Sequence, residues 1–272
     1  MTGEPGTTAP GGRRFSGHDP ATGHDTGGTP WSGRTLGPTG FEGDDGGGDL
    51  ALVTALAAVT APESGESEEE TLLLALSTAR LVVPVVAVAA ELAERDGLTS
   101  DARSDMAAVT LTAADGTRAL PAFTSVATLA AWDPGARPVP MVSQRAALAA
   151  VQEGCQVIVL DLAGPDAWTL RPSMVWALAM ARPWLPAHRD EQVRAAVDAA
   201  LARQDDVVGH ELTAGDHGAL LLTLQVRPGL SEPEVQTLVT AIGEAVATDG
   251  EVRARIDAVT FRLRVSDGAG GC

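Results

Sequence analysis

Hydrophobic positions recur at helical spacing from Asp49 onward. The first such stretch places four apolar residues on one face of an expected helix, namely Leu52, Val53, Leu56 and Val59. A second helix is expected at Ser67, because Ser67 as N-cap and Glu70 three positions later would form a capping box that satisfies two backbone amides. The acidic residues around Glu70 need no catalytic role, since acid in the first turn of a helix suits its dipole.

Apolar runs that follow the second helix predict strands. The run at 80–89 is typical of a buried strand, and Pro84 within it favours an edge position or a bulge, because proline cannot donate a ladder hydrogen bond. A polar loop is expected at about 92–104. Beyond it, the Asp115-Gly116 pair lies between two apolar runs and predicts a β-hairpin.

Helices and strands alternate through the middle of the chain. The expected order is a helix over 126–132, a strand over 136–142, a helix over 143–154, a strand over 155–161 and a helix over 172–183. Ser143 should cap the second of these helices, and Gly154 should end it.

The last third of the chain predicts a strand–helix–strand unit. A helix marked by Val193, Val197 and Leu201 precedes it, and its own helix should begin at a capping box formed by Ser231 and Glu234. The apolar stripe of that helix consists of Val235, Leu238, Val239, Ile242 and Val246. Burial of this stripe is worth on the order of 10 kcal/mol before chain entropy is subtracted.

Composition divides the chain into segments. Residues 1–48 form a Gly/Pro/Thr-rich acidic tail that we expect to be disordered. An α/β domain is expected over 49–182, a linker and helix over 183–204, a smaller domain over 205–266 and a flexible end over 267–272. The predicted fold class is therefore α/β (α+β), with a mixed sheet and flanking helices plus a smaller C-terminal β-α-β unit.

Charge and composition narrow the classes of partner. The formal charge of −17 disfavours nucleic acid and anionic membrane surfaces, which require a concentrated basic patch. Arg262 and Arg264 alternate along a strand-like run, a pattern typical of edge strands protected against aggregation. The longest apolar stretch, 81–90, is too short to span a bilayer, and no secretory signal is visible, so we expect a cytoplasmic protein. Cys155 and Cys272 cannot build a disulfide framework.

Ser125 raises the question of a nucleophile, because it stands between a strand-like run and a helix. A nucleophile elbow carries glycines two residues to either side of its serine, whereas this chain has Phe123 and Ala127 there. Thr124 or Ser125 as helix cap explains the pattern more simply and is worth roughly 1 kcal/mol. We therefore assign no catalytic residue.

Asp161 is better placed for ligand contact, because it ends a strand where open α/β sheets hold ligands. The surrounding sequence is also that of an ordinary turn, and one aspartate without a partner defines no reaction. His210 and His217 lack both the spacing of a helical zinc pair and a third ligand. The sequence contains no Walker A motif, no Gly-rich cofactor fingerprint and no CxxC pair, so no metal or cofactor is predicted.

Three stretches resemble the SseB family of bacteria, especially its actinobacterial branch. They are "RLVVPVVA", the run from Asp105 through Phe123, Thr124, Ser125 and Trp132 to "ARPVP", and "QVIVLDLAGP". The resemblance covers roughly 49–182, and the segment 205–266 is similar to the family's smaller C-terminal domain. It implies a cytoplasmic α/β protein linked by name to enhanced serine sensitivity, with no established biochemical activity and no catalytic residues to carry over.

The leading interpretation is a non-enzymatic binding or adaptor module with an unknown protein partner or small ligand. Phe123, Thr124, Ser125 and Trp132 are expected to be structural, whereas Arg137 and Asp161 are the candidates for contact with a partner. Arg137 could instead pair with Asp133. The rival is a small-molecule sensor or enzyme that uses a polar pocket near Asp161 and the histidines at 210–217. Homo-oligomerisation is left open.

Overall fold

The computed structural model describes residue 41, residues 43–88 and residues 105–266. All of its helices and strands belong to one compact unit, which begins at Asp44. Most of the predicted tail, the whole polar loop at 92–104 and the predicted flexible end lie outside the described residues.

The described elements mix helices and strands, which confirms the predicted α/β class. The helices are α1 (Leu50–Val59), α2 (Glu66–Thr78), α3 (Val126–Trp132), α4 (Ser143–Gln152), α5 (Pro172–Ala179), α6 (Glu191–Leu201), α7 (Glu232–Ala247) and α8 (Gly250–Ala254). The strands are β1 (Arg80–Val88), β2 (Asp105–Ala108), β3 (Leu111–Thr112), β4 (Arg118–Ala122), β5 (Arg137–Val142), β6 (Val157–Leu160), β7 (Trp168–Leu170), β8 (Val207–Ala214), β9 (Leu220–Val226) and β10 (Val259–Val265).

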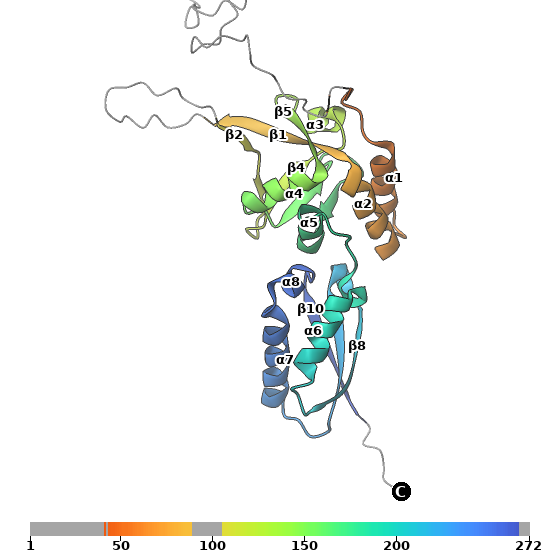
Figure 1. Cartoon of the computed structure of the whole chain (residues 1–272), viewed down its shortest axis with the longest axis vertical. Helices are drawn as coiled ribbons and strands as arrows, with labels where there is room; N and C mark the ends of the chain where they lie inside the picture. Colours follow the sequence, from red (N-terminus) through yellow and green to blue (C-terminus); the bar gives the residue numbers. More distant parts are fainter. Residues whose placement is uncertain (1–40, 42, 89–104, 267–272) are drawn as a thin grey trace, which may run out of the picture. The chain divides into compact units, whose positions relative to one another are not determined.

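Two sheets form the N-terminal part, with orders β2-β1-β5 and β3-β4-β6-β7 (Figure 1). Val82 of β1 and Phe123 join them, because each backbone amide of this pair donates to the carbonyl of the other. The predicted hairpin is confirmed: β3 and β4 are antiparallel, and Gly116 takes a φ of 87° in the turn between them. The buried side chains of α1, α2, α4 and α5 pack with those of the strands into one core cluster.

Pro84 was expected at an edge or a bulge, and that expectation is wrong, because β1 is the central strand of its sheet. The pairing register explains how the sheet accepts it. Pro84 lies opposite Pro138, and Pro140 lies opposite Val82. Alternate pairs of an antiparallel ladder exchange no hydrogen bonds, so three residues without a free amide hydrogen fit at these positions.

Two of the four predicted N-cap residues must be corrected, whereas Ser231 caps α7 as predicted. Ser125 caps α3 as predicted, since its hydroxyl accepts a bond from the amide of Thr128. The cap of α2 is Gly65 instead of Ser67, because the carboxylate of Glu68 reaches back to the Gly65 amide. Ser143 is the first residue of α4 and not its cap, because its hydroxyl is used by the carbonyl of Ala79.

Helix faces follow the predicted patterns with local exceptions. In α1, Leu52, Leu56 and Val59 are buried, whereas Val53 is exposed. In α7 the buried positions of the predicted stripe are Leu238, Ile242 and Val246, whereas Val235 and Val239 are only partly buried. Helix α5 ends at Ala179, short of the predicted end at 183.

The C-terminal part is a sheet of order β10-β9-β8 covered by helices. The predicted strand–helix–strand unit is confirmed, because β9 and β10 are parallel and α7 connects them. Strand β8 was not predicted, and it pairs antiparallel with β9. Helix α6 packs with these strands in a second core cluster. The division of the chain into two domains with a linker stays a prediction.

Candidate functional site

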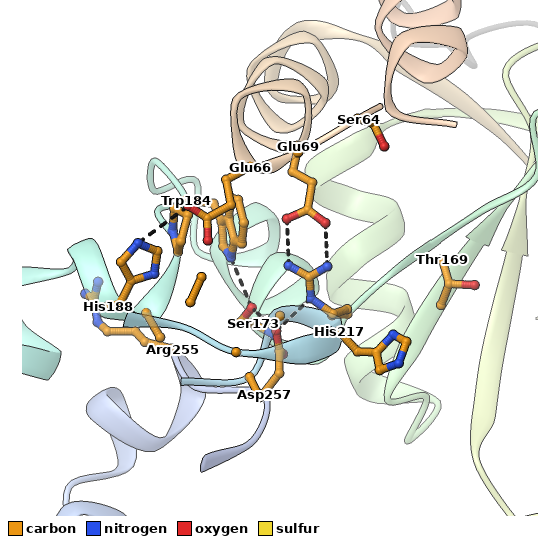
Figure 2. Close-up of a pocket in the computed structure, with 18 of the residues that line it drawn as sticks. Ser64, Glu66, Glu69, Thr169, Ser173, Trp184, His188, His217, Arg255 and Asp257 are labelled. Atoms are coloured by element: carbon orange, nitrogen blue, oxygen red, sulfur yellow. Dashed lines mark hydrogen bonds and ion pairs between the residues drawn. The ribbon is translucent and has the colours of Figure 1, made fainter. Parts of the chain in front are cut away.

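A polar pocket of about 670 Å³ lies where α2, the start of α5, the segment at 184–188 and the turn after β8 come together (Figure 2). The side chains that define its polar surface are Ser64, Glu66, Glu69, Thr169, Arg171, Ser173, His188, His217, Arg255 and Asp257. Segments distant in sequence therefore supply its walls.

Arg171 is the centre of the pocket's charge network. It stands between β7 and α5, and its two terminal nitrogens donate to both carboxylate oxygens of Glu69 at 2.6 and 2.8 Å. Its Nε donates to Asp257 at 3.0 Å. Burial acts to lower the pKa of Arg171, but its hydrogen bonds to Glu69 and then to Asp257, together with the charges of these carboxylates, outweigh burial and raise that pKa above its ordinary value. A bidentate pair of this kind fixes geometry as well as charge.

Asp257 ties the segment before β10 to the start of α5. Besides Arg171, its carboxylate accepts from the amide and the hydroxyl of Ser173, both at 2.8 Å. The Ser173 hydroxyl in turn accepts from the indole nitrogen of Trp184 at 3.0 Å. The Arg171 guanidinium lies 5.6 Å from the centre of the Trp184 ring, a cation–π contact. The polar groups of this network form hydrogen bonds with one another. The network therefore holds together the segment before β10, the start of α5 and Trp184.

The turn after β8 approaches this network closely. His217 and Gly218 both have left-handed backbones, with φ of 54° and 79°. A Cβ atom at Gly218 would lie 2.5 Å from Nε of Arg171, so only glycine allows this approach. His217 lies at the pocket rim, and its ring has no hydrogen bond or ion pair within the described residues (Figure 2). On the opposite wall, His188 faces Glu66 at 3.5 Å.

The predicted residues Thr124, Ser125 and Asp161 come together elsewhere, at the carboxyl ends of β4 and β6. Asp161 is buried, and its two oxygens accept from the amide and hydroxyl of Thr124 at 2.9 and 2.7 Å. Ser125 is occupied with Thr128 in the helix cap. Asp161 therefore holds the connection between β4 and α3. Neither Asp161 nor Ser125 lines the polar pocket.

Phe123 and Trp132 form a small aromatic cluster on the same connection. Phe123 is fully buried, and the two ring centres are 5.4 Å apart. Arg137 is exposed at the start of β5 and forms no ion pair with any described residue. Asp133, its alternative partner, instead accepts the amide of Gly135.

The two histidines predicted near 210–217 separate in the structure. His210 pairs with Asp198 of α6 at 2.8 Å, whereas His217 reaches the pocket. The cluster expected for an enzyme, in which Asp161 and a histidine share one pocket, does not form among the described residues. Those residues also contain no group of three metal-ligating side chains.

Sequence reasoning missed Glu69, Arg171, Ser173 and Asp257. Glu69 belongs to an acidic helix start, which the dipole explains, and the others belong to no recognised motif. Only tertiary packing brings them together.

A second concave surface, of about 600 Å³, is mainly apolar. It runs between one face of α2 and the segment at 181–185, with Leu73, Leu178 and Trp184 among the residues that line it. We call it the α2 groove.

Comparison with models of protein families shows which known domain the chain resembles. Residues 52–177 match the model of the SseB protein N-terminal domain. The chain therefore contains an SseB protein N-terminal domain. The match spans α1 to most of α5, so it includes Glu69, Arg171 and Ser173 of the pocket, whereas Asp257 lies beyond it. Searches among curated proteins and solved structures found no match for this SseB protein. Within its described residues, no helix is both long and apolar enough to cross a membrane.

Proposed function

We propose that this SseB protein is a non-enzymatic binding module, which binds an amphipathic helix of a partner protein in the α2 groove. The observation that carries the proposal is the exposure of large apolar side chains along that groove. Leu74 is 73% exposed and Leu185 is 39% exposed, although both line a concave surface. Exposed apolar surface in a groove is typical of sites for protein partners.

The shape of the groove supports a helical occupant. Most residues of its α2 wall recur at intervals of three or four positions along the helix. The wall consists of Ser67, Glu70, Thr71, Leu73, Leu74 and Ser77. A helix laid along this face would meet side chains over three turns, and its own apolar stripe would cover Leu74.

The polar groups support a binding role over catalysis. Arg171, Glu69, Asp257 and Ser173 bond to one another, and Ser125 and Asp161 are used within the fold. An activated nucleophile needs a base within hydrogen-bond reach and an open position for the substrate. The cytoplasmic location predicted from the sequence belongs to this proposal.

A second candidate function is a small-molecule sensor that uses the polar pocket. His217 favours it, because its left-handed backbone places at the rim of a polar cavity an imidazole that has no partner among the described residues. Here too the bound molecule would be recognised and not transformed.

A site-specific photo-crosslinker distinguishes these functions. Benzoylphenylalanine replaces Leu74 in one variant and Leu50 in a control, since Leu50 is 80% exposed but lies on α1 outside the groove. After irradiation in cells, the proposal predicts an adduct from position 74 alone, mapped to a partner segment with apolar residues at helical spacing. Leu185→Glu should abolish the adduct.

Equal adducts from both positions, or none from position 74, would contradict the binding role of the groove. A His217→Ala variant serves the second candidate. If it changes the set of cellular metabolites that co-purify with the protein while the crosslink is absent, the sensor function replaces the adaptor function.

A further inference from the structure

Strand β10 forms one edge of the C-terminal sheet and pairs only with β9 among the described strands. The pairing is regular from Val259 to Val265, without a register shift. The opposite edge strand, β8, differs, because its register shifts between Val207 and Gly209. Such irregularities blunt an edge against further pairing, whereas a long regular edge accepts another strand.

The hydrogen bonds at the two ends of β10 fix which backbone groups face outward. Leu220 donates its amide to the carbonyl of Ala258, and Ser266 donates to the carbonyl of Val226. Residues of β10 with even numbers therefore bond to β9, because the orientation alternates along a parallel strand. The odd-numbered residues Val259, Phe261, Leu263 and Val265 direct their amides and carbonyls to the open edge.

The side chains of β10 define two rows along this edge. Arg262 and Arg264 lie opposite Thr223 and Gln225 of β9, and no described residue forms an ion pair with either arginine. The other row lies opposite buried apolar residues of β9 yet stays accessible, since Leu263 is 39% and Val265 is 64% exposed. The edge thus alternates cationic and apolar positions in a chain of net charge −17.

This pattern selects the kind of strand that can be added. Side chains directly opposite one another in a sheet interact, and like charges there are destabilising. Two copies of β10 paired antiparallel would bring arginine opposite or diagonal to arginine in any register that joins most of the strand. An extended segment with acidic residues opposite Arg262 and Arg264, and apolar residues between them, would satisfy both rows.

We propose that the open edge of β10 is a docking site for an extended partner segment of alternating acidic and apolar residues, which adds to the sheet as a fourth strand. Main-chain bonds to the odd-numbered residues of β10 hold the segment, and the two arginines select its charge. This site is separate from the α2 groove and does not depend on it.

The test measures binding of a fluorescein-labelled peptide, of the same length as β10, that alternates glutamate and valine. Fluorescence anisotropy with the full chain should show saturable binding, and a peptide that alternates lysine and valine should not bind. The double variant Arg262→Glu/Arg264→Glu should weaken binding by about tenfold or more, since each change replaces an attraction with a repulsion. The matched control is Arg203→Glu/Arg253→Glu, which makes the same change in net charge at two exposed positions, one in the turn after α6 and one in α8, and should leave binding unchanged.

A backbone variant tests strand addition separately from charge. Leu263→Pro removes an amide that faces the open edge and keeps the pairing with β9, because proline is tolerated where a strand needs no donor. It should abolish peptide binding while the protein still melts cooperatively. Binding that survives Leu263→Pro, equal binding of the acidic and basic peptides, or no binding of the acidic peptide would overturn the proposal. A dimer in sedimentation that Leu263→Pro dissociates would also overturn it, because the occupant would then be a second copy.

Discussion

Replacement of Asp257 by alanine tests whether the polar network holds the two ends of the pocket together. The Asp257 carboxylate accepts three bonds, from the amide and hydroxyl of Ser173 at 2.8 Å and from Nε of Arg171 at 3.0 Å. Its side chain is only 10% exposed. Alanine would leave all three donors without this acceptor at the same time.

The expected loss of stability follows from those contacts. Hydrogen bonds to charged groups contribute about 1.5–3 kcal/mol each, so three of them set an upper limit near 9 kcal/mol. The true loss is smaller, because Arg171 keeps its bidentate pair with Glu69 and water can enter from the pocket. We expect about 3 kcal/mol, the lower end of the cost of breaking a buried ion pair. In a protein of this size that lowers the melting temperature by roughly 6–12 °C.

Urea denaturation of a double-mutant cycle measures this effect. Asp257→Ala, Ser173→Ala and the double variant should show a coupling free energy of about 1–2 kcal/mol. Ser173→Ala removes the hydroxyl bond to Asp257 and keeps the bond from the backbone amide, so the coupling reports the hydroxyl bond alone. Asp205→Ala is the matched control, since Asp205 is exposed and its side chain has no partner within the described residues. A coupling below about 0.3 kcal/mol, or a loss for Asp257→Ala no larger than the control's, would refute the reasoning.

Three further predictions concern the N-terminal part. Phe123→Ala should destabilise the protein by about 3–5 kcal/mol, and Trp132→Ala should destabilise it by less. Arg137→Ala should leave the melting curve nearly unchanged, because Arg137 is exposed. If Arg137→Ala alone unfolded the protein, this assignment would be contradicted. Ser125→Ala should cost about 1 kcal/mol of stability in urea denaturation, and a fluorophosphonate probe should not label the wild-type serine. Burial raises the pKa of the Cys155 thiol, so less thiolate is present at neutral pH, and iodoacetamide should modify it far faster in urea than in the native protein; equal rates would show that the thiol is accessible.

Short sequence patterns predicted correctly those parts of the fold that depend on neighbouring residues. The Ser125 cap, the Gly116 turn and the β9–α7–β10 unit each depend on residues a few positions apart, and all three are present. One error arose because a distant residue competes for the same group. Ser143 looked like a cap, but its hydroxyl bonds to Ala79, which is distant in sequence.

The candidate site was less predictable than the fold. The sequence correctly placed Asp161 at a strand end. Its carboxylate accepts a hydrogen bond from the hydroxyl of Thr124, and no sequence spacing predicts this contact. The pocket depends on Glu69, Arg171 and Asp257, which come from three separate parts of the chain. Each of these residues is unremarkable within its own segment, so only the packed structure identifies them as a group.

The membership of α6 in the second core cluster has a consequence for synthesis on the ribosome. Val193, Val197 and Leu201 of α6 pack with β9 and α7, which emerge later. Parallel pairing of β9 with β10 also waits for the last strand to leave the exit tunnel. The apolar face of α6 therefore stays uncovered on the nascent chain until β9 and α7 have emerged from the ribosome, and it is during this interval that we expect chaperones to bind the protein.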